Sequence, residues 1–306
     1  MLRSLFGARP KAAVETAGAD EAEGRAQLDL LTKRLQQLQR IGTQQLYLMG
    51  EAARERILAD PRYDDPLRVE RHGFKVYSQN EEDGILTEIF GRIGLAERTF
   101  WEFGVQDGSE NNTLYRLVDG WRGAWTEGST ADVARIRERF GPAIRDGRLQ
   151  VREALVDRDN VNALAAALGL PRELDLLSID IDGNDFHVWE ALGALAPRVV
   201  VIEYNPKLPP PTRWVMRYDP RHAWDGSDQY GASLAALAAL GARKGYRLVA
   251  CNITGSNAFF VRQDLAGGKF PAVTDPAYYY QPHRAWLTPT FWNLNPVGFG
   301  KGGLVP

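Results

Sequence analysis

The sequence contains a single cysteine, Cys251, among its 306 residues. One cysteine cannot form an intramolecular disulfide or, without a second thiolate, a cysteine metal site, so we expect a reducing, cytoplasmic environment. No apolar run reaches the roughly 18 to 20 residues that span a bilayer, and the first residues lack the apolar core of a secretory signal. The pattern therefore predicts neither a transmembrane segment nor secretion.

The chain also lacks an excess of either charge. Its 37 Lys and Arg residues nearly balance its 39 Asp and Glu residues, for a formal net charge of −2. Because no global positive field would attract a polyanion, we expect no nucleic-acid partner. A hydrophobic content of 44% is typical of globular proteins and is enough for a large core. The length allows one large domain or two modest ones.

The N-terminal residues 1–25 contain few large apolar side chains. Between residues 12 and 24 the sequence consists mostly of Ala, Glu and Gly. Such a segment cannot bury enough apolar surface to offset the entropy of ordering. Residues 1–25 are therefore predicted to form a flexible tail.

Residues 26–64 are predicted to form a helical extension. Apolar residues recur there at intervals of three and four, at Leu28, Leu31, Leu35 and Leu38. Continuing this heptad reaches Gly42 and Gln45, so the helix either packs against its own domain or pairs with a second copy in a homo-oligomer. Asp60-Pro61 and Asp65-Pro66 end it, because the residue before proline is pushed out of the helical region.

Residues 65–275 alternate between strand and helix patterns, and an aromatic-rich tail, 276–306, follows. The predicted strands are 99–103, 124–127, 149–156, 174–181 and 199–204, with 246–251 and 258–262 as a final pair. Helices are predicted at 79–93, 131–140, 160–168, between 186 and 195, and after Ser233. This alternation predicts an α/β protein with a doubly wound sheet, in which ligands bind at the carboxyl ends of the strands.

The first two strand ends carry a pattern typical of nucleoside binding. Gly104 and Gly108 permit a tight turn after the first strand, and Glu102 is a carboxylate at its edge. The turn matches neither a dinucleotide fingerprint nor a P-loop. Glu127 ends the second strand about 25 residues later, where such sheets place the acidic residue that binds ribose hydroxyls. Asp157, after the third strand, either accepts a hydrogen bond from adenine or is a solvated loop carboxylate.

Oxygen-bearing side chains also follow the fourth and fifth strands. Asp180 and Asp182 lie two residues apart, as do Glu203 and Asn205, so each pair shares one face of its strand. Four such oxygen ligands would suit a hard cation, Mg²⁺ or Mn²⁺. In the alternative interpretation, one carboxylate is a base or binds substrate and the others cap a helix.

Several motifs, taken in order, resemble those of class I S-adenosylmethionine-dependent methyltransferases, in a bacterial branch related to the FkbM-type O-methyltransferases. They are YSQNEEDGIL (77–86), EFGVQDGSENNT (102–113), GWRGAWTEG (120–128), LLSIDIDGND (176–185), VVIEYN (200–205), YGASL (230–234) and GSNAFFVR (255–262). The resemblance implies a Rossmann-like, seven-stranded sheet with a reversed last strand. One departure is that Gly104-Val105-Gln106 replaces the family's usual G-x-G.

The resemblance also implies S-adenosylmethionine as cofactor, with the turn after the first strand near its amino acid moiety and Glu127 on its ribose. The candidate cofactor-binding residues are Gln79, Asp83, Glu102, Gly104, Gln106, Asp107, Gly108, Asn112, Glu127, Asp157 and Asp180.

Methyl transfer to a hydroxyl benefits from a group that removes its proton. The catalytic candidates are Asp182, His187 and His222, although each histidine could equally have a packing role. His222 lies in a proline-rich insertion, 206–228, placed where a substrate lid would be. Its aromatic residues, Trp214, Tyr218 and Trp224, either stack on sugar rings or pack the loop.

These observations predict an O-methyltransferase acting on a sugar or polysaccharide precursor. The alternatives are a methyltransferase of a small secondary metabolite and a non-catalytic scaffold that recruits a partner through its N-terminal helix.

Overall fold

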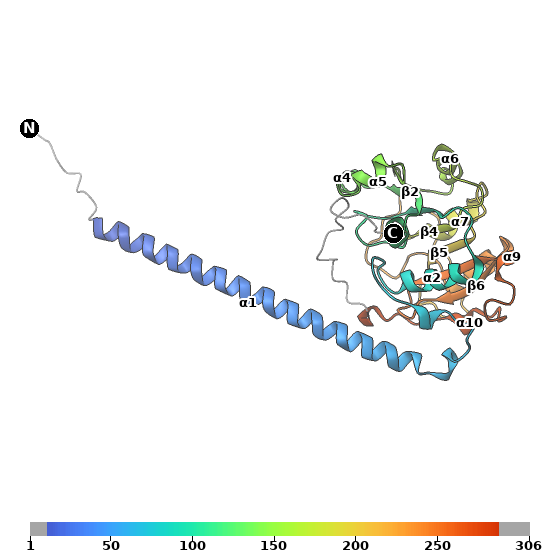
Figure 1. Ribbon diagram of the computed structural model, residues 1–306, viewed down its shortest axis with the longest axis horizontal. Coiled ribbons are helices and arrows are strands. Elements are labelled where there is room, and N and C mark those ends of the chain that lie inside the picture. Colours follow the sequence, from blue (N-terminus) through green and yellow to red (C-terminus); the bar gives the residue numbers. More distant parts are fainter. Residues whose placement is uncertain (1–10, 288–306) are drawn as a thin grey trace, which may run out of the picture. The chain divides into compact units, whose positions relative to one another are not determined.

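The computed structural model describes residues 11–287, with side chains from residue 24 onward except that of Ala285. The chain divides into two compact units between Glu51 and Ala52. Helix α1, Lys11–Leu58, makes up the described part of the first unit and enters the second (Figure 1). None of the helices within the described residues is long and apolar enough to cross a membrane.

Helix α1 corrects the prediction for the N-terminal tail, since residues 11–25 are helical. The composition argument considered only burial, whereas Ala and Glu are among the strongest helix formers, so helix can extend without an apolar face. Further along, Leu28, Leu31, Leu35 and Leu38 are 57–68% exposed. The prediction of a helix over this stretch is confirmed.

The second unit contains a seven-stranded sheet in the order β3-β2-β1-β4-β5-β7-β6. Its strands are β1 (Thr99–Phe103), β2 (Arg122–Glu127), β3 (Leu149–Glu153), β4 (Leu176–Ile179), β5 (Val199–Glu203), β6 (Tyr246–Cys251) and β7 (Asn257–Arg262). Strands β1 to β5 are parallel, while β7 is antiparallel to both β5 and β6. The predicted doubly wound sheet with a reversed last strand is confirmed.

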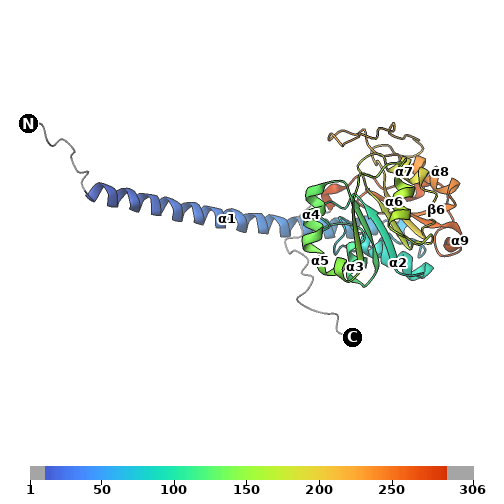
Figure 2. The same cartoon turned by 90° about the horizontal axis from the view of Figure 1, so that it is seen from above.

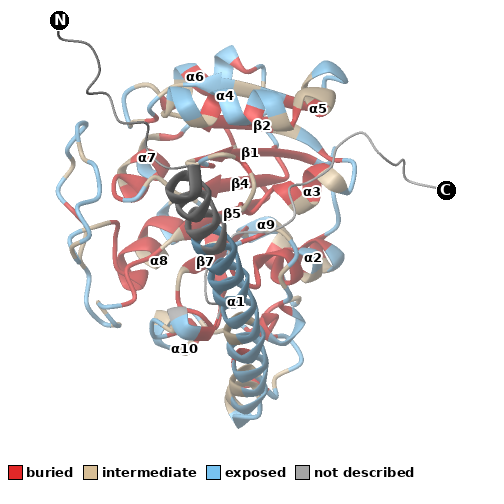
Figure 3. Cartoon of the chain, turned by 90° about the vertical axis from the view of Figure 1, so that its left-hand side faces the viewer, coloured by how far each residue is buried: buried red, intermediate tan, exposed pale blue. Residues whose placement is uncertain are grey.

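Helices cover both faces of this sheet. They are α2 (Glu82–Ile93), α3 (Leu114–Val118), α4 (Thr130–Arg139), α5 (Gly141–Arg145), α6 (Val161–Ala167), α7 (Asp185–Ala191), α8 (Leu234–Arg243), α9 (Gln263–Ala266) and α10 (Pro276–Tyr279). Residues of α2, α3, α4, α5 and α9 share one apolar cluster, and those of α6, α7, α8 and α10 share the other. Figure 2 shows the strands between these two layers, and Figure 3 shows that the strands are buried.

The strands are buried because their side chains alternate between the two layers. In β1, Phe100 packs into the cluster of α2 and Trp101 into that of α6 and α7. Both residues are fully buried. Covered on both faces, such a strand is mostly apolar, and this pattern made the strands recognisable in the sequence.

Two predicted elements are shorter than expected because side chains redirect the backbone. The predicted helix 79–93 begins at Glu82, since the carboxylate of Asp83 accepts hydrogen bonds from the N–H groups of Val76, Tyr77 and Ser78 over 2.7–3.0 Å. The predicted strand 174–181 is reduced to Leu176–Ile179. After it the chain turns, and Asp182 has a positive φ of 56°.

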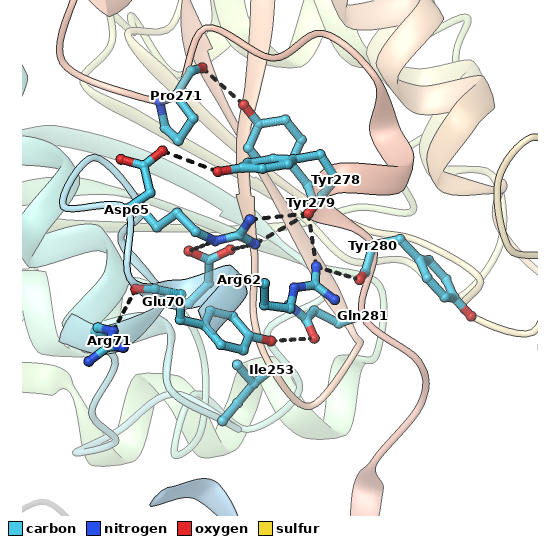
Figure 4. Close-up of polar contacts among 12 residues, drawn as sticks. Arg62, Asp65, Glu70, Arg71, Ile253, Pro271, Tyr278, Tyr279, Tyr280 and Gln281 are labelled. Atoms are coloured by element: carbon cyan, nitrogen blue, oxygen red, sulfur yellow. Dashed lines mark hydrogen bonds and ion pairs between the residues drawn. The ribbon is translucent and has the colours of Figure 1, made fainter. Parts of the chain in front are cut away.

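Residues 61–72 form hydrogen bonds and ring contacts with the segment 278–284, far away in the sequence (Figure 4). Arg62 donates to the carbonyls of Tyr278 and Tyr280, and the hydroxyl of Tyr63 donates to Gln281 over 3.0 Å. Arg68 forms a buried ion pair with Glu70 at 2.6 Å and stacks 4.3 Å from the Tyr278 ring.

The compact units differ from the domain boundaries predicted from the sequence. The compact unit begins at Ala52 rather than after residue 64, and it includes the part of the predicted tail 276–306 that the structure describes. The two proline signals do mark the end of α1. They could not reveal that the residues after it pack against a C-terminal segment more than two hundred residues away.

Candidate functional site

The turn after β1 touches the end of β4 at Gly104. This residue has a φ of +79°, and a Cβ built on it would lie 1.5 Å from the carbonyl oxygen of Asp180. Only glycine fits a position with both a left-handed backbone and so close an approach. The predicted glycine turn therefore brings the β1 loop against Asp180.

Glu127, at the end of β2, holds the same turn. Its Oε2 accepts the Gln106 backbone N–H at 2.8 Å, and its Oε1 accepts that of Ser129 at 2.8 Å. Gln106, which stands where the family pattern has its second glycine, has a φ of 51°, while Val105 is buried in the core. The loop therefore turns its backbone toward Glu127, and the structure brings these two predicted cofactor residues together.

Glu102 has an internal role. Its Oε1 accepts hydrogen bonds from the Asn112 N–H and the Ser178 hydroxyl, each at 2.9 Å, and its Oε2 accepts the N–H and hydroxyl of Thr113. Burial raises the pKa of this carboxyl, opposed by these donors. The Asn112 amide in turn donates to Ser178 at 3.0 Å. Glu102 and Asn112, both predicted to bind the cofactor, thus anchor the segment before α3.

The rest of the β1 loop packs toward α4. Asp107 accepts two hydrogen bonds from Ser109 and lies 3.1 Å from Arg139, an ion pair on the α4 side. These partners outweigh partial burial and lower the pKa of Asp107. A Cβ at Gly108 would lie 2.8 Å from ring atoms of Phe140 and Trp125. Asp107 and Gly108 therefore shape the loop.

Three further cofactor candidates, Asp83, Gln79 and Asp157, lie outside the β1 loop. Asp83 caps the loop before α2, as described above, and burial raises its pKa. Gln79 is exposed on that loop, where its carbonyl accepts from Lys75 at 2.7 Å. The Oδ1 of Asp157 accepts the N–H groups of Asp159 and Asn160 at 2.8 Å. This favours the loop interpretation of Asp157.

Asp180, Asp182 and Glu203 form a cluster of carboxylates, called here the acidic triad. One carboxylate oxygen from each lies within 4.8 Å of the others. Nothing among the described residues donates a hydrogen bond to these three carboxylates, and no Lys or Arg there pairs with them. Burial, then the neighbouring carboxylates, raise the pKa of Asp180 and of Glu203 well above the ordinary range.

The neighbours of the triad are engaged elsewhere. Buried Asp185 accepts the N–H groups of Ile181 and Gly183 at 2.9 and 2.8 Å, and so shapes the turn between β4 and α7. Asn205, the predicted fourth metal ligand, donates through its side-chain amide to the carbonyls of Asp228 and Tyr230. Its Oδ1 accepts the backbone N–H of Lys207 at 3.1 Å. Its amide holds the base of the insertion.

Both candidate histidines connect the insertion to α7 and to the turn before it. His187 Nε2 donates to the Met216 carbonyl at 2.8 Å, and its ring packs edge to face with Tyr218. His222 Nε2 lies 3.0 Å from the Asp182 carbonyl oxygen. The predicted packing role fits His187, whereas His222 contacts the acidic triad.

Sequence reasoning missed a buried network at the same edge of the sheet. Glu82 accepts the side-chain amides of Asn252 and Asn257 at 2.7 and 2.9 Å, which joins α2 to the β6–β7 turn. Neighbouring Glu81 accepts the N–H groups of Ile253 and Thr254. Burial, then the charge of Glu82, raise the pKa of Glu81 to about 7. Two adjacent acidic residues just before an apolar helix were the only signal.

No protein-family model and no curated protein matches the chain. Solved methyltransferase structures do. A putative O-methyltransferase from Klebsiella pneumoniae is 14% identical with a TM-score of 0.42, over 71% of this chain and 96% of its own. The N-terminal domain of EvdMO1 with SAH bound is 11% identical with a TM-score of 0.40, over 68% and 94%.

An O-methyltransferase family protein from Burkholderia thailandensis is 10% identical with a TM-score of 0.37, over 60% of this chain, which spans only 58% of that protein. At such identities and TM-scores, none of these structures assigns an activity or a residue role to this chain.

Proposed function

We propose that this chain is an S-adenosylmethionine-dependent O-methyltransferase. The observation that carries the proposal is the convergence of three features at one edge of the sheet. The turn at Gly104, the carboxylate of Glu127 and the acidic triad follow four different strands, yet Gly104 lies against Asp180 and Gln106 bonds to Glu127. In open α/β sheets this edge binds the ligand.

The charge of this edge suits the cofactor. S-adenosylmethionine carries a positive sulfonium and a positive ammonium group, and both would gain from the field of nearby carboxylates. The chain offers Asp180, Asp182 and Glu203 without a basic partner among the residues described. Glu127 keeps a lone pair on each oxygen after its two hydrogen bonds, so it can also accept from ribose hydroxyls.

The acidic triad also fits a divalent cation. Carboxylate oxygens are the donors that Mg²⁺ and Mn²⁺ prefer, and these three already lie within reach of one ion. Asp180, Asp182 and Glu203 would hold it, and Asn205 would support the insertion beside it. A bound cation would lower the pKa of a coordinated hydroxyl. In methyl transfer a carbon–oxygen bond would form as the carbon–sulfur bond of the cofactor breaks, and the hydroxyl proton would pass to a base.

We propose a sugar or polysaccharide precursor as the acceptor. Trp224 supports this, because it is 55% exposed on the insertion while its indole Nε1 is bonded to the Ser227 carbonyl. An exposed indole held by a hydrogen bond is suited to stacking on a sugar ring. Tyr218 is less available, since Arg158 lies 3.8 Å from its ring centre.

Two measurements test the activity. Calorimetry should detect binding of S-adenosylmethionine and S-adenosylhomocysteine, and absence of binding to folded protein would refute the cofactor assignment. Incubating cell extracts with methyl-labelled cofactor and the protein should give new labelled products in mass spectrometry. An Asp182→Asn protein should label far less while still binding cofactor. Cofactor binding without any labelled product would instead favour a non-catalytic scaffold.

We further propose that α1 self-associates. Four of its leucines are exposed and spaced as in a coiled-coil seam. Packing of an apolar face supplies most of the stability of a helix in a protein, so a second copy that covers these leucines would stabilise α1.

A further inference from the structure

The insertion is seated on the turn that carries Asp182. The Asn184 amide donates to the Asp219 carbonyl at 2.7 Å, and His187 bonds the Met216 carbonyl. His222 Nε2 reaches the Asp182 carbonyl oxygen at 3.0 Å. Because a carbonyl only accepts, this nitrogen carries the proton and donates. Three separate points of the insertion thus hold α7 and the turn before it.

The backbone of Asp182 needs such support. Its φ of 56° lies in the left-handed region, which is unfavourable for a residue with a Cβ. On one side, the Asp185 carboxylate accepts the N–H groups of Ile181 and Gly183, the residues that flank Asp182. The carbonyl of Asp182 is bonded to His222. Asp185 and His222 together fix the peptide groups around this residue.

The contact between His222 and the turn is tight. A Cβ built on Gly183 would lie 2.2 Å from Cδ2 and 2.6 Å from Nε2 of His222. The φ of Gly183 is not positive, so alanine is compatible with its backbone and would collide only with its neighbours. The glycine leaves the space in which the imidazole lies.

We propose that His222 is a positioning residue for the acidic triad. By holding the Asp182 carbonyl, it keeps this strained residue in the conformation that places its carboxylate beside those of Asp180 and Glu203. This inference rests on the proposed cation site. Through the imidazole of His222, the insertion becomes part of the structure that binds the cation. The turn at Gly104 and Glu127 does not depend on His222.

The test compares Mn²⁺ binding, followed by electron paramagnetic resonance of the free ion, with S-adenosylhomocysteine binding, followed by calorimetry. His222→Ala should weaken Mn²⁺ binding about tenfold or more, as loss of an outer partner of a metal ligand usually does, and leave cofactor binding unchanged. Gly183→Ala should have the same effect, because it displaces the imidazole. His222→Gln, whose amide can still donate, should retain most of the affinity.

Two variants serve as matched controls. His283→Ala removes an exposed histidine, and Gly193→Ala adds a methyl group where no atom lies within 4 Å. Both should bind Mn²⁺ like the unmodified protein. If His222→Ala does not fold, as judged by its thermal transition, the Mn²⁺ affinities of Gly183→Ala and His222→Gln decide whether His222 positions the acidic triad.

Unchanged Mn²⁺ affinity in folded Gly183→Ala and His222→Ala proteins would overturn the inference while leaving the proposed function intact. An unmodified protein that binds S-adenosylhomocysteine but not Mn²⁺ would overturn both the cation site and this role of His222. Failure to bind S-adenosylhomocysteine would refute the proposed function itself.

Discussion

The backbone N–H of Gln106 donates to the carboxylate of Glu127 over 2.8 Å. This bond joins the turn after β1 to the end of β2 and holds Gln106 at a φ of 51°. The two elements that the sequence assigned separately to the cofactor therefore support each other. Removing the carboxylate should remove both a ribose ligand and the support of the turn.

Glu127→Ala should weaken binding of S-adenosylmethionine by about 1.5 to 3 kcal/mol, the usual cost of losing a hydrogen bond to a charged group. Calorimetry measures the change. Glu153→Ala is the matched control, because Glu153 is the register partner of Glu127 on β3, is exposed, and bonds to Thr130. Equal affinities for the two folded variants would remove Glu127 from the site.

Gly104→Ala should destabilise the fold by about 3 kcal/mol or more, because strain at positive φ adds to a clash with the Asp180 carbonyl. Gly94→Ala separates the two effects. Gly94 has a similar φ of +75°, but a Cβ there meets nothing within 4 Å, so the cost should stay near 1 kcal/mol. Chemical denaturation compares them, and similar losses in both variants would contradict the close approach of the two loops.

Glu81→Gln should change how stability depends on pH. Burial raises the pKa of Glu81 from 4.5 to about 7, so between these values the folded state holds a proton that the unfolded state has lost. The contribution of protonated Glu81 to the stability of the folded state is therefore fully present below pH 4.5 and is lost as the pH rises to about 7. Over this pH range, the free energy of unfolding should fall by roughly 3 kcal/mol because of Glu81.

The Gln variant should lack this loss, so the gap in unfolding free energy between it and the unmodified protein should change between pH 4.5 and about 7 and level off above that. Urea denaturation at each pH measures the gap. Glu97→Gln, at an exposed ion pair with Arg122, should follow the unmodified protein. Parallel curves for Glu81→Gln and the unmodified protein would show that Glu81 ionises normally.

A chain beginning at Ala52 should fold and bind cofactor like the full chain. It keeps Ala53, Ile57 and Leu58, which pack near buried Tyr63 and Ile253. A chain beginning at Asp65 loses Tyr63, which is 1% exposed, and should be less stable by about 3 kcal/mol or more. Thermal unfolding compares the two. Equal stabilities would restore the boundary predicted from the prolines.

Exchanging Leu31 and Leu35 together for glutamate should lower the mass per particle in light scattering, because charges in an apolar helix seam oppose pairing. Cofactor affinity should not change. Gln36→Glu adds a charge outside the leucine stripe and should leave the mass unchanged. A full-length protein that is already monomeric at micromolar concentration would contradict self-association through α1.

The sequence predicted much of the fold because local signals sufficed for it. The apolar runs at Thr99–Phe103 and Tyr246–Cys251 match strands β1 and β6 to the residue, and Ser233 caps α8 as predicted. The strand ends located the candidate site for the same reason. In a parallel sheet, Glu127 and Asp180 must lie at one edge wherever their strands stand in the order.

Partners far apart in the sequence were not predictable in this way. Glu102, predicted to face the cofactor, is fully bonded to Asn112, Thr113 and Ser178, and no spacing rule indicates that its oxygens would be used internally. Likewise, Asn205 was predicted beside Glu203, yet it turns to the insertion.

The sequence by itself therefore determined the α/β class and the edge at which chemistry is expected, since these depend on the periodicity and order of local segments, while the reversed last strand was implied by the resemblance of its motifs to methyltransferases. Only the tertiary structure decided which carboxylates have no donor. It left Asp180, Asp182 and Glu203 together without hydrogen-bond donors among the described residues, and it brought His222 onto the Asp182 turn. Hydrogen bonds are short and directional, so which groups they satisfy depends on loop conformations that no single segment specifies.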